Sequence, residues 1–129
     1  MLFSSRPSSP LIWTVRIVLA AALLAAGASK LLGLPFQVQL FETLGFGQWF
    51  RYFTGAAELA IALLLLLPRT GFAGGLSLLA TMLCAVAVHL FFIGGSPVPA
   101  LLLGAMAGFV AWRLRPLGAN GNADSASLP

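Results

Sequence analysis

Ionisable side chains within apolar segments are the residues of this sequence that could do chemistry, and Glu58 is the clearest of them. It stands inside the run Thr54–Pro68, TGAAELAIALLLLLP. A carboxylate near the centre of a helix in lipid costs about 2.5–3.5 kcal/mol on insertion scales, whereas each Leu or Ile favours insertion by roughly a few tenths of a kcal/mol. The segment can still insert, but Glu58 must turn inward and find a partner elsewhere in the chain.

Lys30, His89 and Arg51 are the candidate partners. Lys30 and His89 each stand about one turn before the end of an apolar run, the first and the third of the chain. If the helices are antiparallel, Lys30, Glu58 and His89 fall within about 8 Å of one level in the membrane. Arg51 lies about two turns from Glu58 on nearly the same helical face. We therefore predict a ligand-binding or ion-pair cluster of Lys30, Glu58, His89 and Arg51.

Two interpretations of this cluster stay open at the level of sequence. In the structural interpretation, Lys30 or Arg51 neutralises a buried Glu58, His89 completes a hydrogen-bond network, and the cluster fixes the helix register. Lys30 alone could also extend its ammonium to the lipid headgroups. In the functional interpretation, the cluster lines a wet cleft that opens to the outside and binds a ligand or exchanges protons. Ionisable groups within membranes are by default candidates for functional sites.

The amino-acid composition indicates the surroundings of the protein. Of 129 residues, 60% are hydrophobic and 8% are charged, whereas a soluble domain carries about 25% charged residues. The predicted surroundings are therefore a lipid bilayer. The seven basic residues mostly flank apolar runs, which indicates membrane topology and not a phosphate-binding face, so no nucleic-acid partner is expected.

Residue counts exclude several kinds of active site. The chain has one cysteine, Cys84, and one histidine, so it lacks an internal disulfide, a CxxC redox pair and the two axial ligands of a bis-histidine haem. A metal site would have only Glu58 and His89 as ligands. No Gly-rich phosphate loop or nucleophile elbow occurs. We predict no catalytic residue, no metal and no resident cofactor, and we expect that the protein is not an enzyme on its own.

Four apolar runs predict an all-α fold, an antiparallel four-helix transmembrane bundle. Between the first two runs, apolar residues recur at helical spacing from Pro35 to Gly45, which predicts a short interfacial amphipathic helix. A disordered arm and a disordered tail are expected at the two ends of the chain. The predicted parts are the arm (1–12), a domain (13–114) with spans 13–34, 49–67, 70–93 and 98–114, and the tail (115–129).

The distribution of basic residues predicts the orientation. Four spans place both termini and the loop between the second and third spans on one side of the membrane. The basic residues of that side are Arg6, Arg69, Arg113 and Arg115, with Arg16 nearby. Only Lys30 and Arg51, both at helix ends, belong to the other side. The positive-inside rule therefore places both termini of this multi-pass protein in the cytoplasm.

Two further motifs leave alternatives open. Ala26-Gly27-Ala28 mimics a signal-peptidase site, which would remove residues 1–28, but the apolar run continues past it and three more spans follow. Gly71-xxx-Gly75 and Gly104-xxx-Gly108 are small-residue faces that could pack within the bundle or between copies of the chain. Self-association therefore stays open.

Over about residues 16–114 the chain resembles the DoxX-like family of small four-helix bacterial inner-membrane proteins. The motifs that carry the resemblance are Ala26-Gly27-Ala28-Ser29-Lys30-Leu31, Leu44-Gly45-Phe46, Gly55-Ala56-Ala57-Glu58-Leu59 running into Leu63–Pro68, and His89. The family takes its name from a subunit of a thiosulfate:quinone oxidoreductase, and some relatives are thought to join redox or oxidative-stress complexes. The resemblance therefore implies the same fold and the bacterial inner membrane.

Together with the buried cluster, the resemblance implies an accessory or scaffold subunit of a quinone-linked membrane redox system. Quinone is the one cofactor expected to touch the cleft of Lys30, Glu58 and His89. The expected partners are the lipid bilayer, other membrane redox subunits and further copies of the chain. The alternative is a small-molecule or proton-coupled carrier in which Glu58 titrates. A membrane-resident enzyme is a third hypothesis, and it would need a bound cofactor.

Overall fold

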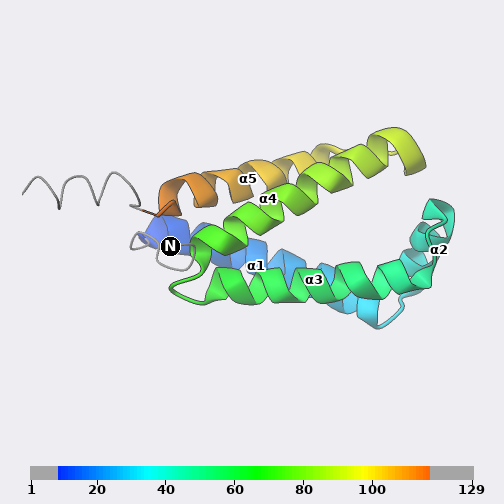
Figure 1. Cartoon of the computed structure of the whole chain (residues 1–129), viewed down its shortest axis with the longest axis horizontal. Helices are drawn as coiled ribbons and strands as arrows, with labels where there is room; N and C mark the ends of the chain where they lie inside the picture. Colours follow the sequence, from blue (N-terminus) through cyan, green and yellow to red (C-terminus); the bar gives the residue numbers. More distant parts are fainter. Residues whose placement is uncertain (1–8, 117–129) are drawn as a thin grey trace, which may run out of the picture.

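The protein is all-α in its computed structural model, which describes residues 9–116 (Figure 1). In chain order the elements are α1 (Pro10–Leu31), α2 (Pro35–Leu44), α3 (Gln48–Leu66), α4 (Gly71–Val88), the π-helix η1 (His89–Ile93) and α5 (Val98–Leu114). No β-strand occurs within residues 9–116, so the all-α prediction is confirmed. Residues 1–8 of the predicted arm and 117–129 of the predicted tail lie outside the described part of the chain.

Helix α1 begins at Pro10 and ends at Leu31, earlier than the predicted span 13–34 at both ends. Ser9 is its N-cap, because the Ser9 hydroxyl oxygen accepts a hydrogen bond from the Ile12 N–H. Pro10 occupies the first turn, where its missing N–H is tolerated. After the helix, Gly33 has a φ of +69°, a left-handed conformation that glycine adopts without steric cost. Residues 10–12, which the sequence pattern assigned to the arm, therefore belong to α1.

The remaining helices have bounds close to those predicted. Helix α5 spans residues 98–114 as expected. Helix α3 differs from the predicted span 49–67 by one residue at each end, and the continuous stretch from α4 through η1 differs from the predicted span 70–93 by one residue at its start. The short helix α2 begins at Pro35 and ends before Gly45, whose φ of +80° stops the helix. The helix expected between the first two spans is therefore present, with the predicted bounds.

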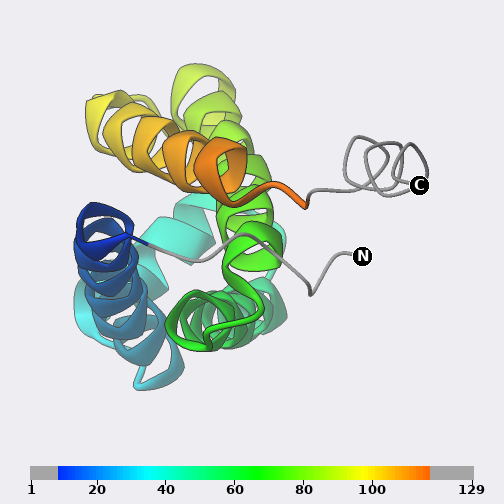
Figure 2. The same ribbon diagram turned by 90° about the vertical axis from the view of Figure 1, so that its left-hand side faces the viewer.

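The four long helices form two pairs. Helix α1 lies beside α3 and α4 lies beside α5, and the two helices of each pair run in opposite directions (Figures 1 and 2). The pairs meet at the end where α1 begins and α5 ends, and they diverge towards the end that holds α2 (Figure 1). The buried core draws on all four helices, with Ile12, Leu65, Leu78 and Leu114 among its members.

Close approach between helices depends on two glycine contacts. A Cβ added at Gly27 would lie 2.9 Å from the carbonyl oxygen of Gly55, and one added at Gly75 would lie 3.0 Å from the backbone nitrogen of Ala111. Both neighbours are backbone atoms, which cannot turn aside as a flexible side chain can. Gly27 therefore sets the separation of α1 from α3, and Gly75 sets that of α4 from α5.

Three helical stretches are long and apolar enough to cross a bilayer, Pro10–Leu31, Gln48–Leu66 and Gly71–Ile93. Val98–Leu114 is also apolar but shorter, at 17 residues. Large apolar side chains such as Leu102, Phe91 and Trp112 face outward from the protein. Helices that are apolar on all sides are typical of membrane spans.

Gly75→Ala is expected to destabilise the protein, whereas Gly108→Ala is not. Both glycines are interior positions of helices, so the gain in helix propensity, about 1 kcal/mol, is shared by the two variants. At Gly75 the new methyl group presses on the backbone of α5, and overpacking of this kind costs about 1–3 kcal/mol. At Gly108 the nearest atoms are side-chain carbons of Leu79 at 3.8 and 3.9 Å, an ordinary contact.

Melting temperatures of the two purified variants in the same detergent test this expectation. A Gly75→Ala protein that melts at or above the temperature of Gly108→Ala would contradict the assigned role of the Gly75 contact.

Candidate functional site

One ion pair joins α1 to α3. Lys30, in the last turn of α1, places its Nζ 2.7 Å from Oε1 of Glu58, near the middle of α3. The two side chains are only 14% and 8% exposed, so little solvent screens their attraction. Two of the four residues of the predicted cluster are therefore in direct contact.

The geometry of the two helices explains this pairing. Helices α1 and α3 touch at Gly27 and Gly55, which precede Lys30 and Glu58 by one turn in their own helices. Helical side chains lean towards the N-terminus of their helix, so side chains on antiparallel neighbours can lean towards each other. A Cβ added at Gly55 would lie 3.0 Å from the Cβ of Lys30. A larger residue at this position would therefore push the Lys30 side chain out of place.

Arg51 stabilises the end of α1. It is 5% exposed, and its Nε donates to Oε1 of Gln48 at 2.7 Å. Its Nη1 donates to the backbone carbonyl of Lys30, and the guanidinium stacks on the Tyr52 ring at 4.3 Å from the ring centre. Carbonyls at the C-terminal end of a helix lack helical partners and carry partial negative charge. Arg51 gives the Lys30 carbonyl a charged donor in addition to the Gly33 N–H at 3.2 Å, and so holds the Lys30 backbone in place.

Gln37 ties α2 to the same turn of α1. Its Nε2 donates to the hydroxyl oxygen of Ser29 at 2.9 Å, and that hydroxyl donates to the carbonyl of Ala26 at 2.7 Å. Gln37 is 6% exposed, and its Oε1 is buried without a hydrogen-bond partner among residues 9–116. Sequence reasoning missed this contact, because glutamine at this position fits the polar face that an interfacial helix turns to water.

His89 makes its hydrogen bond within its own helix. It is half-buried at the start of η1, and its Nδ1 lies 2.9 Å from the carbonyl oxygen of Ala85 on its own helix. The buried residues of α4 all lie in its first half: Gly71, Gly74, Gly75 and Leu78. Towards its C-terminal end, α4 diverges from α3 (Figure 1). A joint role of His89 and Glu58 stays a prediction.

Arg16 is a second buried charge, which sequence reasoning assigned only to topology. It is 0% exposed in α1. Its Nε donates to the carbonyl of Leu65 at 2.8 Å and its Nη2 to that of Leu67 at 2.5 Å, while Trp13 lies 3.9 Å below the guanidinium. Both carbonyls belong to the end of α3, where Pro68 prevents further helical hydrogen bonds. The signal that could have revealed the contact is an arginine at the same membrane depth as a helix end that a proline terminates.

The arrangement satisfies charges inside the protein and presents no obvious reactive group. Lys30 and Glu58 form an ion pair with each other, and Arg16 and Arg51 donate hydrogen bonds to carbonyls at helix ends. Within the described part of the chain, no three His, Cys, Asp or Glu side chains gather as metal ligands. Cys84 is exposed on α4. The chemistry that this geometry supports directly is the electrostatic joining of helices.

Apolar helices of spanning length that match their buried charges internally define a membrane protein. The chain matches the model of the DoxX-like family over residues 14–114, and it belongs to this family. The resemblance predicted from sequence is therefore confirmed. A search of curated proteins and a search of solved structures each found no match. The matched region contains Lys30, Arg51, Glu58 and His89.

Removal of either partner of the ion pair is expected to destabilise the protein more than removal of both. Lys30→Met leaves Glu58 as an unpaired buried charge, and Glu58→Gln leaves Lys30 unpaired, at a cost of about 3–5 kcal/mol in each case. The double variant leaves no buried charge and should recover most of this loss. Thermal unfolding of the four proteins in detergent gives the coupling energy directly. Additive losses of stability in the double variant would show that the two residues do not act as a pair.

Arg16→Lys is expected to destabilise the protein even though the charge is kept. Lysine offers a single ammonium group and cannot reproduce the planar fork that reaches both Leu65 and Leu67. Hydrogen bonds that involve charged groups are worth about 1.5–3 kcal/mol. Arg113→Lys is the matched control, because Arg113 is exposed. Equal melting temperatures for the two lysine variants would refute the role of Arg16 at the end of α3.

Proposed function

We propose that the protein is an accessory or scaffold subunit of a quinone-linked redox system in the bacterial inner membrane. The Lys30–Glu58 pair carries this proposal. Both charges lie on apolar helices, and they form an ion pair in which Nζ of Lys30 is 2.7 Å from Oε1 of Glu58. A pair of this kind is suited to holding helices in register, and an isolated titrating group would be more suited to catalysis. The redox context comes from the family, as the resemblance implies.

In this proposal all four long helices cross the bilayer as one bundle, with both termini in the cytoplasm. Arg16 is in the first half of α1, Arg69 is in the turn between α3 and α4, and Arg113 and Arg115 are at the end of α5. These segments lie at the end of the molecule where α1 begins and α5 ends (Figure 1). Lys30 and Arg51 lie towards the opposite end, which is therefore the outer one by the positive-inside rule. Excess basic residues on one side are the observation that supports the orientation.

We place α2 at the outer interface of the membrane. A cluster of aromatic rings surrounds the turn between α2 and α3, where Phe50 contacts the rings of Phe41, Phe46 and Trp49. Trp49 and Tyr52 are exposed, as aromatic residues at the headgroup level commonly are. The short helix would thus lie along the membrane surface and cover the polar contacts of Ser29 and Gln37.

The surface that we assign to other redox subunits is the outer face of η1. Its residues Leu90 and Phe91 are 61% and 77% exposed, and no residue of η1 is buried within the chain. Such a face offers a partner helix apolar contact area without any charge to be matched. A second copy of the chain could use the same face.

A deletion strain tests the proposed function. Membranes that lack the protein are expected to show lower quinol- or thiosulfate-linked oxygen consumption than wild-type membranes, because an accessory subunit supports the assembly of its complex. Expression of the wild-type protein should restore the rate. The Lys30→Met, Glu58→Gln double variant should also restore the rate, since a scaffold needs helices that pack in register and does not need the two charges themselves. Unchanged oxygen consumption in the deletion strain would overturn the proposal.

The carrier alternative gives a different result with the same double variant. If Glu58 titrates during transport, a double variant that is present at wild-type levels and equally stable will still fail to restore function. Uptake into proteoliposomes that disappears in Glu58→Gln would then establish the carrier. Restoration by the double variant excludes it.

A further inference from the structure

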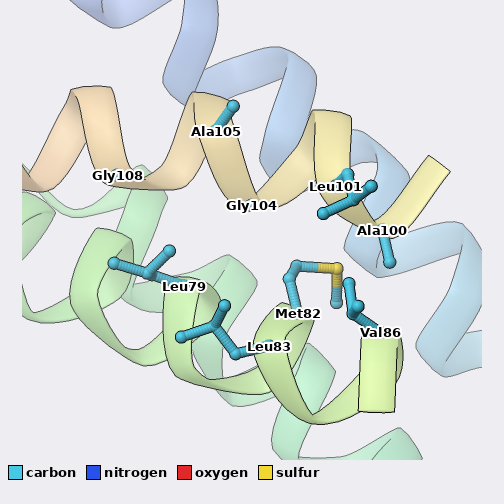
Figure 3. Close-up of a pocket in the computed structure, with 9 residues that line it drawn as sticks. All are labelled: Leu79, Met82, Leu83, Val86, Ala100, Leu101, Gly104, Ala105 and Gly108. Atoms are coloured by element: carbon cyan, nitrogen blue, oxygen red, sulfur yellow. The ribbon is translucent and has the colours of Figure 1, made fainter. Parts of the chain in front are cut away.

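An apolar groove runs between α4 and α5 (Figure 3). It has a volume of about 310 Å³, and all of its lining residues are Leu, Met, Val, Ala or Gly. Leu79 and Met82 line it from α4, and Gly104 and Gly108 line it from α5. An apolar cavity of about 150 Å³ takes one benzene molecule, which has six carbons. The groove therefore has room for roughly twelve carbons of an alkyl chain.

The six basic side chains of residues 9–116 fall into two groups. Three of them are matched inside the protein, by a carboxylate or by backbone carbonyls. The other three are exposed and belong to the end of the molecule where α5 ends: Arg69, Arg113 and Arg115. The two carboxylates of residues 9–116 lie elsewhere, Glu42 in α2 and Glu58 near the middle of α3. This end therefore carries positive charge that no carboxylate of the described chain offsets.

Arg115 stands beyond the groove on the same side of α5. It is the C-cap of the helix and follows Gly108 by about two helical turns, so it lies on nearly the same helical face, about 10 Å farther along the axis. Its guanidinium is 5.2 Å from the ring centre of Trp112, and its Nη1 donates to the Trp112 carbonyl at 2.7 Å. A guanidinium has further N–H donors in a planar fork, which suits the oxygens of a phosphate group.

Arg69 is brought to the same end by a tertiary contact. It lies in the turn between α3 and α4, two residues before Gly71. A Cβ on Gly71 would lie 2.5 Å from Cδ1 of Leu114, the residue before Arg115. The turn that carries Arg69 therefore packs against the last turn of α5, and the positive charge of Arg69 adds to that of Arg115.

The end of α5 lies at the level of the lipid head groups. Trp112 is 60% exposed in the last turn of the helix, as tryptophan at a membrane interface commonly is. One leaflet measures about 20 Å from the head groups to the bilayer midplane. An acyl chain whose head group lies at Arg115 can therefore reach the groove, which begins about 10 Å deeper. A phospholipid joins the two parts that these places fit, an anionic phosphate and an alkyl chain.

We propose that α4 and α5 bind one anionic phospholipid. Its phosphate accepts hydrogen bonds from Arg115 beside Trp112, in the positive field of Arg69, and one acyl chain lies in the groove along Gly104 and Gly108. A zwitterionic head group brings a cation of its own, for which the described chain offers no carboxylate at this end. The site shares no residue with the ion pair between α1 and α3, and it does not depend on the proposed redox role.

Competition between two matched lipids tests the proposal. Dioleoylphosphatidylglycerol and dioleoylphosphatidylcholine carry the same acyl chains but differ in the net charge of the head group. The purified full-length protein in detergent is mixed with equal amounts of both, and the retained lipids are counted by native mass spectrometry. A basic side chain near an anionic membrane surface is worth about fivefold in affinity. Two arginines therefore predict a preference for phosphatidylglycerol of at least about tenfold. Equal retention of the two lipids by wild type would overturn the proposal without any variant.

Arg115→Gln and Arg113→Gln are a matched pair of variants for the head group. Each removes one exposed positive charge from the end of α5. Arg113, however, lies about 140° round the helix from Gly108, and its guanidinium is 5.8 Å from the ring centre of Phe109. Arg115→Gln should lower the preference for phosphatidylglycerol about fivefold, and Arg113→Gln should change it less than about twofold. Equal losses in the two variants would indicate diffuse attraction to this end of the protein and would overturn the proposal.

Gly108→Leu tests the position of the acyl chain. A leucine side chain there fills the groove and should lower the retention of both lipids about tenfold, because the chain loses its apolar contacts. Ala60→Leu adds the same side chain at an exposed position of α3 and should change neither lipid. A Gly108→Leu protein that melts as wild type does and retains both lipids fully would overturn the proposal. So would a Gly108→Leu protein that changes from dimer to monomer with its lipid retention unchanged, since a second copy of the chain would then fill the groove.

A soluble probe separates a lipid site from a site for free phosphate groups. Glycerophosphoglycerol is the head group of phosphatidylglycerol without its acyl chains. It should not displace the lipid from wild type at equal concentration, because the groove supplies most of the contact area. Displacement at equal concentration would assign the site to a free anion and overturn the proposal. This result needs no variant, so it stands even if Gly108→Leu fails to fold.

Discussion

Every charge placed on an apolar helix must be matched inside the protein, and in this chain α1 and α3 meet that requirement together. Helix α1 brings two cations, Arg16 near one end and Lys30 near the other. Helix α3 supplies the acceptors for both, the carboxylate of Glu58 and the carbonyls of Leu65 and Leu67. The two contacts lie at opposite ends of one helix pair, so they fix its register as well as its separation.

The second pair of helices is attached to the first over a limited length. Gly74 lets α4 approach the backbone of α3 closely, since a Cβ there would lie 3.0 Å from the nitrogen of Leu65. Beyond Leu78, α4 buries no further residue, and the two pairs diverge. At the wide end one aromatic contact joins the parts again, where Phe46 meets Phe92 at 5.9 Å between ring centres.

Which features could be predicted from the sequence depends on the kind of information that each one needs. Helix bounds follow from local signals, and Pro35, Gly45 and Pro68 mark them correctly. Ser9 and Pro10 also mark the start of α1, as a cap and a first-turn proline, although the apolar run alone predicts a start at Trp13. Helix depth predicts that Lys30 and Arg51 are both candidate partners of Glu58, and the structure shows the ion pair with Lys30.

Depth alone does not predict lateral position. His89 was expected at the level of Glu58, yet two helices at the same level can be well separated when they diverge, and no local pattern shows the angle between them. Arg16 was missed for another reason. Its partners are backbone carbonyls, which every residue has, so no residue type identifies them in the sequence. Gln37 likewise pairs with a serine across a turn that only the docking of α2 brings close.

The division of charge between the two helix pairs has a consequence for the synthesis of the chain. The hydrogen bonds of Arg16 to Leu65 and Leu67 and the ion pair of Lys30 with Glu58 are made by residues up to Leu67. Helices α1 and α3 can therefore form these contacts in the membrane before α4 and α5 are synthesised. The hairpin of α4 and α5 then packs against α1 and α3 through apolar contacts and close approach at glycines. A Cβ on Gly71 of α4 would lie 2.8 Å from Cζ of Arg16, so the hairpin covers this guanidinium, and its separation from α1 and α3 would expose the charge to lipid.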